Sequence, residues 1–268
     1  MEVDVAVRAY PPAWRWAAAF LFALSRAMQP FLLWRLVTAD DPPITPPLLA
    51  ELLLIFCVLP ALAAWLIGRA FAVRAQVGDG GLVLQRGAQR VVWPSTTVRP
   101  WWVPLPEAGC TLTRGDGAQV GLGLRDPAPL VAALGGDGDH PLLRYGAARA
   151  AVRRGWRYWL GRYVLYALPI AAILFRAHQW IAYGGTFGQY YLQGPAPWLR
   201  GAAIYWATTG AYLLLWASLW RGVVEALALL GAFLAPGAAA STRRWLEWGD
   251  RLAFYGGSAA ILALRFLD

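Results

Sequence analysis

The sequence predicts a polytopic α-helical membrane protein with about five spans, four or six being the alternatives, and a small inserted α+β sheet domain. Three observations support this fold class. The 268 residues are 59% hydrophobic and only 15% charged, with a mean hydropathy of +0.44, whereas soluble domains carry about 25% charged residues. Several apolar runs approach the roughly 20 residues that a membrane-spanning helix needs. Between these runs, one stretch alternates with the two-residue period of a β-strand.

Residues 1–70 are predicted to form an N-terminal transmembrane hairpin. Its apolar runs are Trp16 to Val37 and Pro47 to Ile67, joined by a short, acidic, proline-rich loop. Arg69 and Arg74 follow the second run, and this bias of basic residues places the N-terminus in the cytoplasm. The N-terminus lacks a cleavable-signal pattern and is expected to be retained.

Residues 71–136 are predicted to form a cytoplasmic sheet domain of about six strands followed by one helix. Leu82 and Leu84 occupy alternate positions, as do Cys110 and Leu112 further along the chain. Glycine-containing turn signals separate these alternating runs. Asp126 is expected to cap the helix that follows. Since the polar backbone of a sheet cannot lie exposed in lipid, this domain belongs in water.

This order of strands and helix, attached directly to a membrane hairpin, resembles the pleckstrin-homology-like (PH-like) domains of bacterial membrane proteins. The resemblance covers about residues 70–136. It rests on the strand order, on the Asp79-Gly80 and Asp116-Gly117 turns, and on the segment "VVWP". The resemblance implies a membrane-attached binding or scaffolding module, and it implies no catalytic residues.

Residues 137–157 are predicted to form a basic juxtamembrane helix. Arg149, Arg153 and Arg157 recur every four residues and therefore share one helical face. Such a row suits anionic lipid headgroups, at about 1 kcal/mol for each charge close to the surface. The alternative is that these arginines act only as a topology signal.

Residues 158–268 are predicted to hold the C-terminal transmembrane helices. The third span runs from about Tyr158 to Phe175, and the aromatic segment 176–200 follows as an external interfacial or re-entrant element. The next apolar run, 201–234, is too long for one crossing. Arg221 and Glu225 are expected to mark its cytoplasmic exit. A short last span, about 252–267, leaves the C-terminus outside.

Charged residues inside the first two spans are candidate functional residues. Arg26 lies near the middle of the first span, where a charge costs at least about 2.5–3.5 kcal/mol. It is expected to snorkel or bind a backbone carbonyl, to line an ion or anionic-ligand pathway, or to contact a partner subunit. Arg35 and Glu51 lie at similar depth near the outer side and can form a structural bridge.

One face of the fourth span carries a polar and aromatic stripe. Its members are Tyr205, Thr209, Tyr212, Trp216 and Trp220. The stripe either packs against neighbouring helices or lipid, or lines a groove for a flat or polyprenyl ligand. No polar cluster would fix such a ligand, so the sequence predicts no cofactor.

The external segment holds His178, Tyr190 and Tyr191 as interfacial candidates. A catalytic histidine needs a nucleophile and an orienting group, and neither accompanies His178. The two cysteines, Cys57 and Cys110, fall in different compartments and are not expected to form a disulfide. No spacing resembles a metal site.

The segment "RPWWVPLPEAG" (residues 99–109) is the unusual surface of the sheet domain. Adjacent residues of a strand point to opposite faces, so Trp101 and Trp102 cannot both enter one small core. One of them is expected to cover the core while the other docks on a membrane or a partner. The surrounding prolines disfavour edge pairing.

The leading functional hypothesis is a non-enzymatic scaffold or accessory subunit of a membrane protein complex in the bacterial inner membrane. All 24 basic residues are Arg, a bias typical of GC-rich bacterial codon usage. Membrane lipids, anionic ones above all, and other membrane subunits are the expected partners. Nucleic acid is not, because the arginines are spread along the chain. The alternatives are a transport or channel component using Arg26, and a lipid-modifying enzyme using His178.

Overall fold

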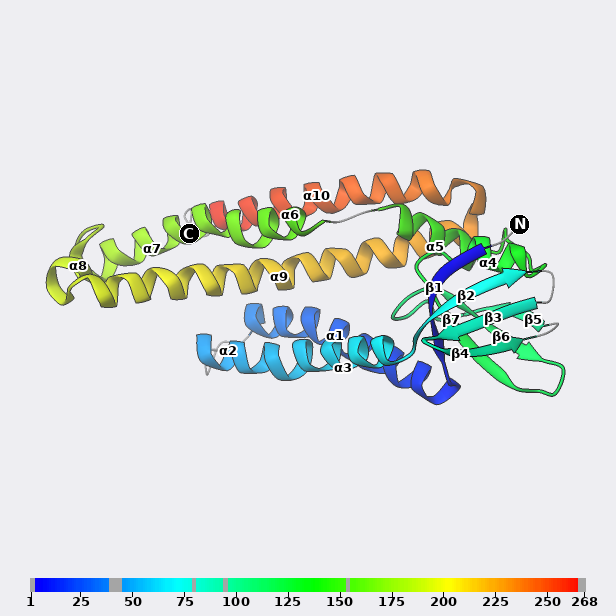
Figure 1. The fold of residues 1–268 in the computed structure, drawn as a ribbon. Helices are drawn as coiled ribbons and strands as arrows, with labels where there is room; N and C mark the ends of the chain where they lie inside the picture. Colours follow the sequence, from blue (N-terminus) through cyan, green and yellow to red (C-terminus); the bar gives the residue numbers. More distant parts are fainter. Residues whose placement is uncertain (1–2, 39–44, 79–80, 94–95, 153–154, 265–268) are drawn as a thin grey trace. The chain divides into compact units, whose positions relative to one another are not determined.

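The computed structural model describes residues 3–38, 45–78, 81–93, 96–152 and 155–264 (Figure 1). Its strands are β1 (Val3–Tyr10), β2 (Ala72–Gly78), β3 (Gly81–Arg86), β4 (Gln89–Trp93), β5 (Thr96–Pro100), β6 (Gly109–Arg114) and β7 (Gln119–Gly123). Its α-helices are α1 (Pro12–Thr38), α2 (Pro46–Leu53), α3 (Leu59–Ala70), α4 (Ala128–Ala133), α5 (Pro141–Ala151), α6 (Trp156–Trp159), α7 (Ala167–Tyr183), α8 (Gly188–Gln193), α9 (Pro195–Leu234) and α10 (Ala239–Leu264). Two π-helical stretches, η1 (Leu54–Val58) and η2 (Leu160–Leu165), and the 3₁₀ turn η3 (Pro236–Ala238) complete the list.

The sheet is antiparallel throughout, in the order β4-β3-β2-β1-β7-β6-β5. Six of these strands lie in the segment that the sequence assigned to the sheet domain. The seventh, β1, was not expected, and it occupies the centre of the sheet between β2 and β7 (Figure 1). The sheet therefore extends beyond residues 71–136 to include 3–10. In sequence, the first helical hairpin lies between β1 and β2, which are neighbours in the sheet.

Covalent geometry shows that this sheet must curl. Strands β4 and β5 lie at opposite edges, yet only two residues separate Trp93 from Thr96. The α-carbons of Trp93 and Thr96 are at most about 11 Å apart. The edges of a flat seven-stranded sheet, in contrast, are separated by about 29 Å. The two meanders, β2-β3-β4 and β5-β6-β7, consequently bend around one interior.

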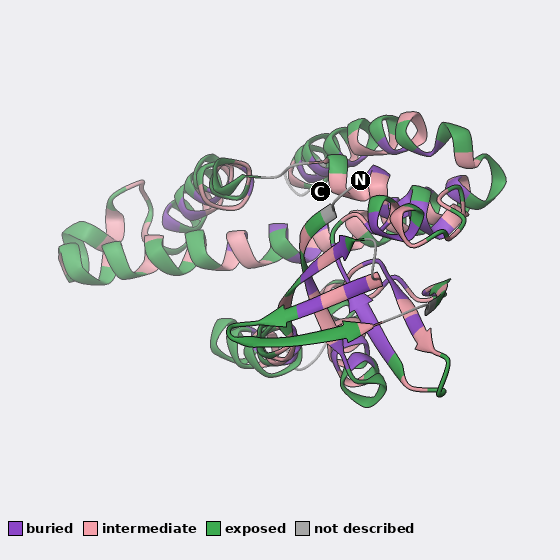
Figure 2. Ribbon diagram, turned by 45° about the vertical axis from the view of Figure 1, so that its right-hand side comes forward, coloured by how far each residue is buried: buried purple, intermediate pink, exposed green. Residues whose placement is uncertain are grey.

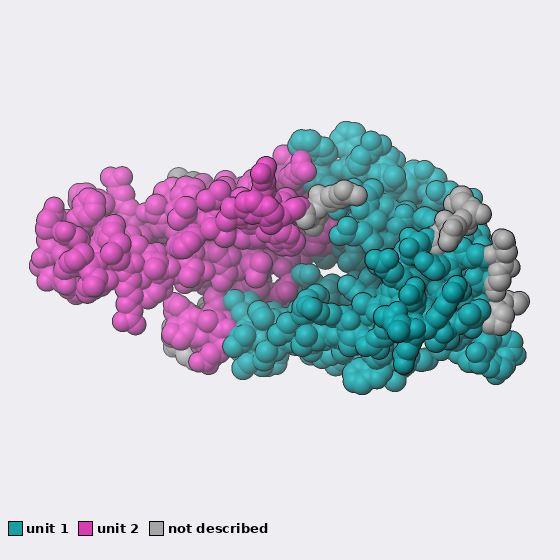
Figure 3. Space-filling model, viewed as in Figure 1, with its two compact units in different colours: residues 1–28, 52–152, 222–249 teal, residues 29–51, 153–221, 250–268 magenta. Residues whose placement is uncertain are grey.

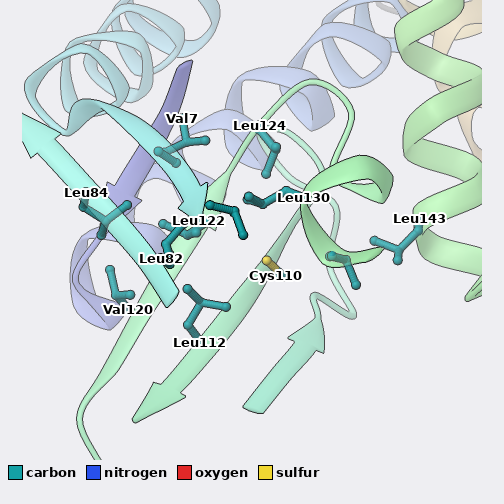
Figure 4. Close-up of a cluster of buried hydrophobic side chains, with 13 residues drawn as sticks. Val7, Leu82, Leu84, Cys110, Leu112, Val120, Leu122, Leu124, Leu130 and Leu143 are labelled. Carbon is teal, nitrogen blue, oxygen red and sulfur yellow. The ribbon is translucent and has the colours of Figure 1, made fainter. Parts of the chain in front are cut away.

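That interior is filled by the alternating side chains that the sequence identified. Leu82, Leu84, Cys110 and Leu112 are buried, with Val120, Leu122 and Leu124 beside them in the same cluster (Figure 4). Paired strands bring these positions together, because Cys110 is opposite Leu122 and Leu112 is opposite Val120. Helix α4 supplies Leu130 and Val131, and α5 supplies Leu143, so the end of the curled sheet is closed by helices.

Turns and caps follow the predicted chemistry where they are described. Gly87 and Gly117, in the β3–β4 and β6–β7 turns, adopt positive φ angles of 57° and 85°, which glycine tolerates best. The amide of Ala128 donates to the side chain of Asp126 over 3.2 Å, as expected for the start of α4. Residues Asp79 and Gly80 lie outside the described part of the chain.

Four described helical segments are long and apolar enough to cross a membrane: Pro12–Thr38, Pro46–Ala70, Trp156–Tyr183 and Pro195–Leu234. At most 28% of the most apolar 18-residue stretch of each segment is buried inside the protein, and Figure 2 colours many residues of the long helices as exposed. Apolar surface on this scale is rare in soluble monomers. The sequence predicted about five spans with four or six as alternatives, and the described residues hold four candidates, without α10. Its apolar part, 252–264, covers only about 20 Å.

Figure 3 shows the two compact units into which the chain divides. The first comprises residues 1–28, 52–152 and 222–249, and it contains the sheet, the adjoining part of the first hairpin, α4, α5, the end of α9 and the start of α10. The second comprises residues 29–51, 153–221 and 250–268. Each of the polar clusters described below lies within one unit.

Candidate functional site

The candidate site is the loop between β5 and β6, residues 101–108, here called the tryptophan loop. Backbone bonds close its base: the amide of Trp101 donates to the carbonyl of Gly109 over 2.9 Å, and the amide of Leu124 donates to Ala108 over 3.0 Å. Both tryptophans follow the end of β5, so they belong to the loop rather than to a strand as the sequence suggested. Their side chains nevertheless separate as expected.

Trp101 is buried, with only 3% of its surface exposed. Its indole N–H donates to the Thr111 hydroxyl over 3.0 Å. The ring packs against Gly109 so closely that a Cβ at that position would lie 2.7 Å from it, which explains the glycine there. Trp101 is thus the buried one of the two tryptophans, and it packs on the face of β6 and β7 that carries Gly109, Thr111 and Gly121, not in the cluster around Cys110 and Leu112.

Two arginines hold the outer part of the tryptophan loop. Arg15, in the first turn of α1, stacks over the Trp101 ring at 4.2 Å and over the Trp16 ring at 4.5 Å. Its guanidinium also donates to the carbonyl of Val103 over 3.3 Å. Arg149 of α5 donates to the carbonyl of Pro104 over 3.4 Å. The loop is thereby fixed to the first helix of the hairpin and to α5.

A third arginine neutralises the acid of the loop. Arg8 of β1 forms a 2.9 Å ion pair with Glu107, and the Tyr10 hydroxyl donates to the same carboxylate over 3.4 Å. Burial raises the pKa of the Glu107 carboxyl above its ordinary value, while Arg8 pulls it down. Burial, reinforced by Glu107, raises the pKa of Tyr10 to about 12. The cluster joins the loop to the central strand.

The product of these contacts is a rigid loop that presents one large side chain to its surroundings. Trp102 is 79% exposed, although its neighbour is buried and three arginines hold the loop around it. The arrangement offers a fixed apolar contact rather than a reactive group. The sequence left open which of Trp101 and Trp102 would dock, and the structure leaves Trp102 available for that role.

The expected row of headgroup-binding arginines is not a single helical face. Helix α5 ends at Ala151, the next residue is extended, and α6 begins at Trp156. Arg149 and Arg157 therefore belong to different helices, and Arg153 lies outside the described residues. Arg149 binds the tryptophan loop, and the Arg157 guanidinium lies 5.7 Å from the Trp156 ring.

The charged candidates of the first hairpin do not form the expected bridge. Arg35 and Glu51 are both exposed, and no ion pair joins them in the part of the chain that the structure describes. Arg26 is also exposed and lies over the Phe22 ring at 5.1 Å. Its neighbour Ser25 is buried, and the Ser25 hydroxyl donates to the Cys57 carbonyl in η1 over 2.7 Å.

The stripe on α9 is largely engaged in helix packing. Tyr205 contacts the Phe175 and His178 rings of α7, each at 5.5 Å. Trp216 packs on Gly257 of α10, where a Cβ would meet the indole at 2.6 Å. These contacts favour the packing interpretation. The remaining members are Thr209, which is buried, Tyr212, which is 40% exposed, and Trp220, which meets Trp216 edge-on.

The segment 176–200, predicted to be an external interfacial or re-entrant element, is mostly helical. Helix α7 continues to Tyr183, and Gly184 ends it with a φ of 71°. The turn is held by Gln179, fully buried, whose amide donates to the Gln189 side chain over 2.9 Å and accepts from the Gln189 backbone. The predicted candidates sit around this glutamine pair: His178 is exposed between two tyrosine rings, and Tyr190 and Tyr191 are exposed by 42% and 80%.

Two buried ionic clusters were missed by the sequence analysis. In the first, Arg243 of α10 donates through Nη1 and Nη2 to both oxygens of Glu225, each over 2.8 Å, and through Nε to Glu247 over 2.9 Å. The Tyr145 hydroxyl of α5 donates to Glu225 over 2.6 Å. The sequence had assigned Glu225 only to a membrane exit.

The second cluster joins Arg162, in η2, to Asp250 of α10 over 2.8 Å. Their side chains are only 3% and 1% exposed. Arg162 also donates to the Tyr158 hydroxyl and stacks over the Phe254 ring at 3.8 Å. Its Nε and Nη2 and one oxygen of Asp250 have no hydrogen-bond partner among the described residues. π-Helical segments such as η2 recur at functional sites.

The cysteines and the side chains able to bind a metal form no shared cluster within the described residues. Cys57 and Cys110 are both buried and unpaired, and burial raises the pKa of the Cys110 thiol to about 12. No three His, Cys, Asp or Glu side chains gather as a metal site in those ranges. The chain matches no protein-family model, no curated protein and no solved structure.

Proposed function

We propose that this chain is a non-enzymatic scaffold or accessory subunit of a membrane protein complex in the bacterial inner membrane. The observation that carries the proposal is an apolar stripe at the end of α9. Val223, Leu227, Leu230 and Leu234 are all exposed, and their spacing of four, three and four residues places them along one line of the helix. This spacing is the seam by which α-helices pack together.

The position of the stripe along α9 argues against lipid as its covering. Arg200 and Arg221 are 21 residues apart, about 32 Å on a helix, which matches a hydrocarbon core of about 30 Å. The residues beyond Arg221 then extend out of the core. The Glu225–Arg243–Glu247 cluster supports this placement, because paired charges with partly exposed carboxylates suit a polar setting.

The opposite face of the same segment is already used within the protein. Ala228 and Ala232 pack against Tyr145 and Ala148 of α5 and against Ala239 of α10. The stripe is therefore held on a supported helix and faces away from that support. A partner helix with a matching apolar face is the occupant that we propose, since the stripe carries no charge of its own.

The orientation of the protein is part of the proposal. β1 and β2 pair in one sheet although the first hairpin separates them, which supports an even number of crossings between them. The arginines that follow the hairpin favour the cytoplasm for this side. The PH-like resemblance is supported by seven antiparallel strands in two meanders with a helix after the last strand.

Purification from native membranes in mild detergent, with crosslinking mass spectrometry, tests the scaffold role. The wild-type chain is expected to bring a stoichiometric partner crosslinked near the stripe. Leu227→Glu combined with Leu230→Glu is expected to lose that partner. Val91→Glu combined with Val92→Glu, at equally exposed positions of β4, is the matched control and keeps it. A chain that purifies alone contradicts the proposal.

A second candidate, a transport or channel component, is favoured by the Arg162–Asp250 pair. Buried ionisable residues among apolar helices mark ion and proton pathways in membrane proteins. Proton flux into proteoliposomes that carry a pH-sensitive dye tests this candidate, with an expected loss of flux in Asp250→Asn. Equal flux in empty liposomes and in liposomes with the wild-type protein excludes it.

A further inference from the structure

The tryptophan loop is attached to the base of the first hairpin. Arg15 lies in the first turn of α1, and its guanidinium is sandwiched between the Trp16 and Trp101 rings. Because α1 is one of the helices long and apolar enough to cross a membrane, its first turn lies at the membrane boundary. The sandwich therefore holds the loop at that boundary, within one compact unit.

Exposed tryptophans surround the same base. Trp14 and Trp16 at the start of α1 are 50% and 54% exposed, and Trp65 near the end of α3 is 50% exposed. Arg69 lies over the Trp65 ring at 5.4 Å. Tryptophan with nearby arginine is the composition typical of helix ends in the headgroup region. Trp102, more exposed than any of these, continues the set onto the sheet domain.

The charge around the loop suits an anionic surface. Arg8, Arg15 and Arg149 all contact the loop, and its one acid, Glu107, is paired with Arg8. The surplus charge is positive, and such a surface is attracted to the anionic cytoplasmic leaflet. An indole combines an apolar body with one polar N–H, which is the side chain best suited to the same depth.

We propose that Trp102 inserts into the lipid headgroup region and that the tryptophan loop rests the sheet domain on the bilayer. The loop is built for this contact in advance, because Trp101 anchors it inward and the arginines fix its backbone. The sheet domain is then held at the membrane by three points: the two ends of the first hairpin and Trp102. This inference does not depend on the scaffold role.

Depth measurement by electron paramagnetic resonance tests the insertion. A spin label at Trp102→Cys, with Cys57→Ala and Cys110→Ala, is compared in lipid nanodiscs for collisions with oxygen, which concentrates in lipid, and with a water-soluble nickel complex. Trp16→Cys serves as the lipid reference. Gly115→Cys, at the opposite end of β6 and about 20 Å along that strand, serves as the aqueous reference.

The label at position 102 is expected to follow the Trp16 site, with high oxygen and low nickel accessibility. A label as accessible to nickel as the one at position 115 overturns the proposal. A label shielded from both reagents also overturns it, because that result places Trp102 in a protein contact. Nanodiscs with and without anionic lipid distinguish the contribution of the arginines, and a shallower label is expected without anionic lipid.

Discussion

Arg162 and Arg243 are equally buried, with 3% and 2% of their side chains exposed, but their hydrogen bonding differs. Arg243 directs Nε, Nη1 and Nη2 at two glutamates, one of them gripped through both oxygens. Arg162 leaves Nε and Nη2 without a described partner, and Asp250 leaves one oxygen. The first cluster is a complete structural clamp, and the second is only partly satisfied.

The difference shows that burial alone does not decide whether a charged pair stabilises the fold. Desolvating a charge costs several kcal/mol, and only good geometry with full hydrogen bonding offsets that cost. The Arg243 cluster meets this condition and joins α5, α9 and α10. The Arg162 pair meets it in part, so stability alone explains it less well. Under-satisfied buried polar groups are the ones that a functional explanation must account for.

Removal of the clamp is expected to have the largest effect. Arg243→Met leaves Glu225 and Glu247 close together without their cation, which is expected to cost about 3–5 kcal/mol of folding stability. Thermal unfolding in detergent measures this loss. Arg244→Met is the matched control, because Arg244 is the exposed neighbour on the same helix, and its melting temperature is expected to change little.

The Arg162–Asp250 pair is expected to tolerate replacement of both partners better than replacement of one. Asp250→Leu alone strands a buried arginine and is expected to cost about 3 kcal/mol or more. Arg162→Leu with Asp250→Leu is expected to recover most of that loss, since an apolar pair needs no hydrogen bonds. A double-mutant cycle by thermal unfolding measures the coupling. Purely additive losses would remove the distinction between the two clusters.

The Arg8–Glu107–Tyr10 cluster extends the comparison to pH. The pKa of Tyr10 is raised to about 12, so the folded state keeps a proton that the unfolded state loses near pH 10. Stability from this source is complete below pH 10 and is lost as the pH rises through 12, by at most about 3 kcal/mol. Tyr10→Phe is expected to reduce the fall in melting temperature between pH 10 and pH 12. An unchanged fall would assign this pH dependence to other titrating groups.

The smallest effect is expected for an arginine in water. Arg114 pairs with Asp116 in the exposed β6–β7 turn, where solvent screens the charges. Arg114→Ala is expected to leave the melting temperature unchanged within error at physiological salt. A clear drop in melting temperature would show that hydrogen bonding, rather than burial, governs how much these arginines stabilise the fold.

The sheet could be predicted from the sequence in most of its parts, because its strands alternate and its turns carry glycine. The exception is β1, although "VDVAVRAY" also alternates. This alternation does not by itself predict a strand, because the segment runs directly into an apolar helix and its partners begin more than 60 residues later. Val3 pairs with Val77 across the whole first hairpin, and local sequence patterns do not predict pairing between such distant segments.

Of the candidate site, the sequence predicted only the two tryptophans. Two adjacent tryptophans indicated one inward and one outward side chain, which is how Trp101 and Trp102 lie. The residues that hold the loop come from elsewhere: Arg15 acts across 88 positions of sequence and Tyr10 across 97. The Arg162–Asp250 contact also spans 88 positions. Such contacts are set by the fold, and no spacing rule announces them.

The central place of β1 has a consequence for biosynthesis. This strand leaves the ribosome before the first hairpin but has no partner until β2 follows, and the sheet is not complete until β7. A hairpin that entered the membrane with a single crossing would leave β1 and β2 on opposite sides of the bilayer. The sheet would then lack its middle strand, and its apolar interior would stay open to quality-control proteases. With the topology proposed above, correct insertion of the first two helices is therefore a precondition for folding the sheet.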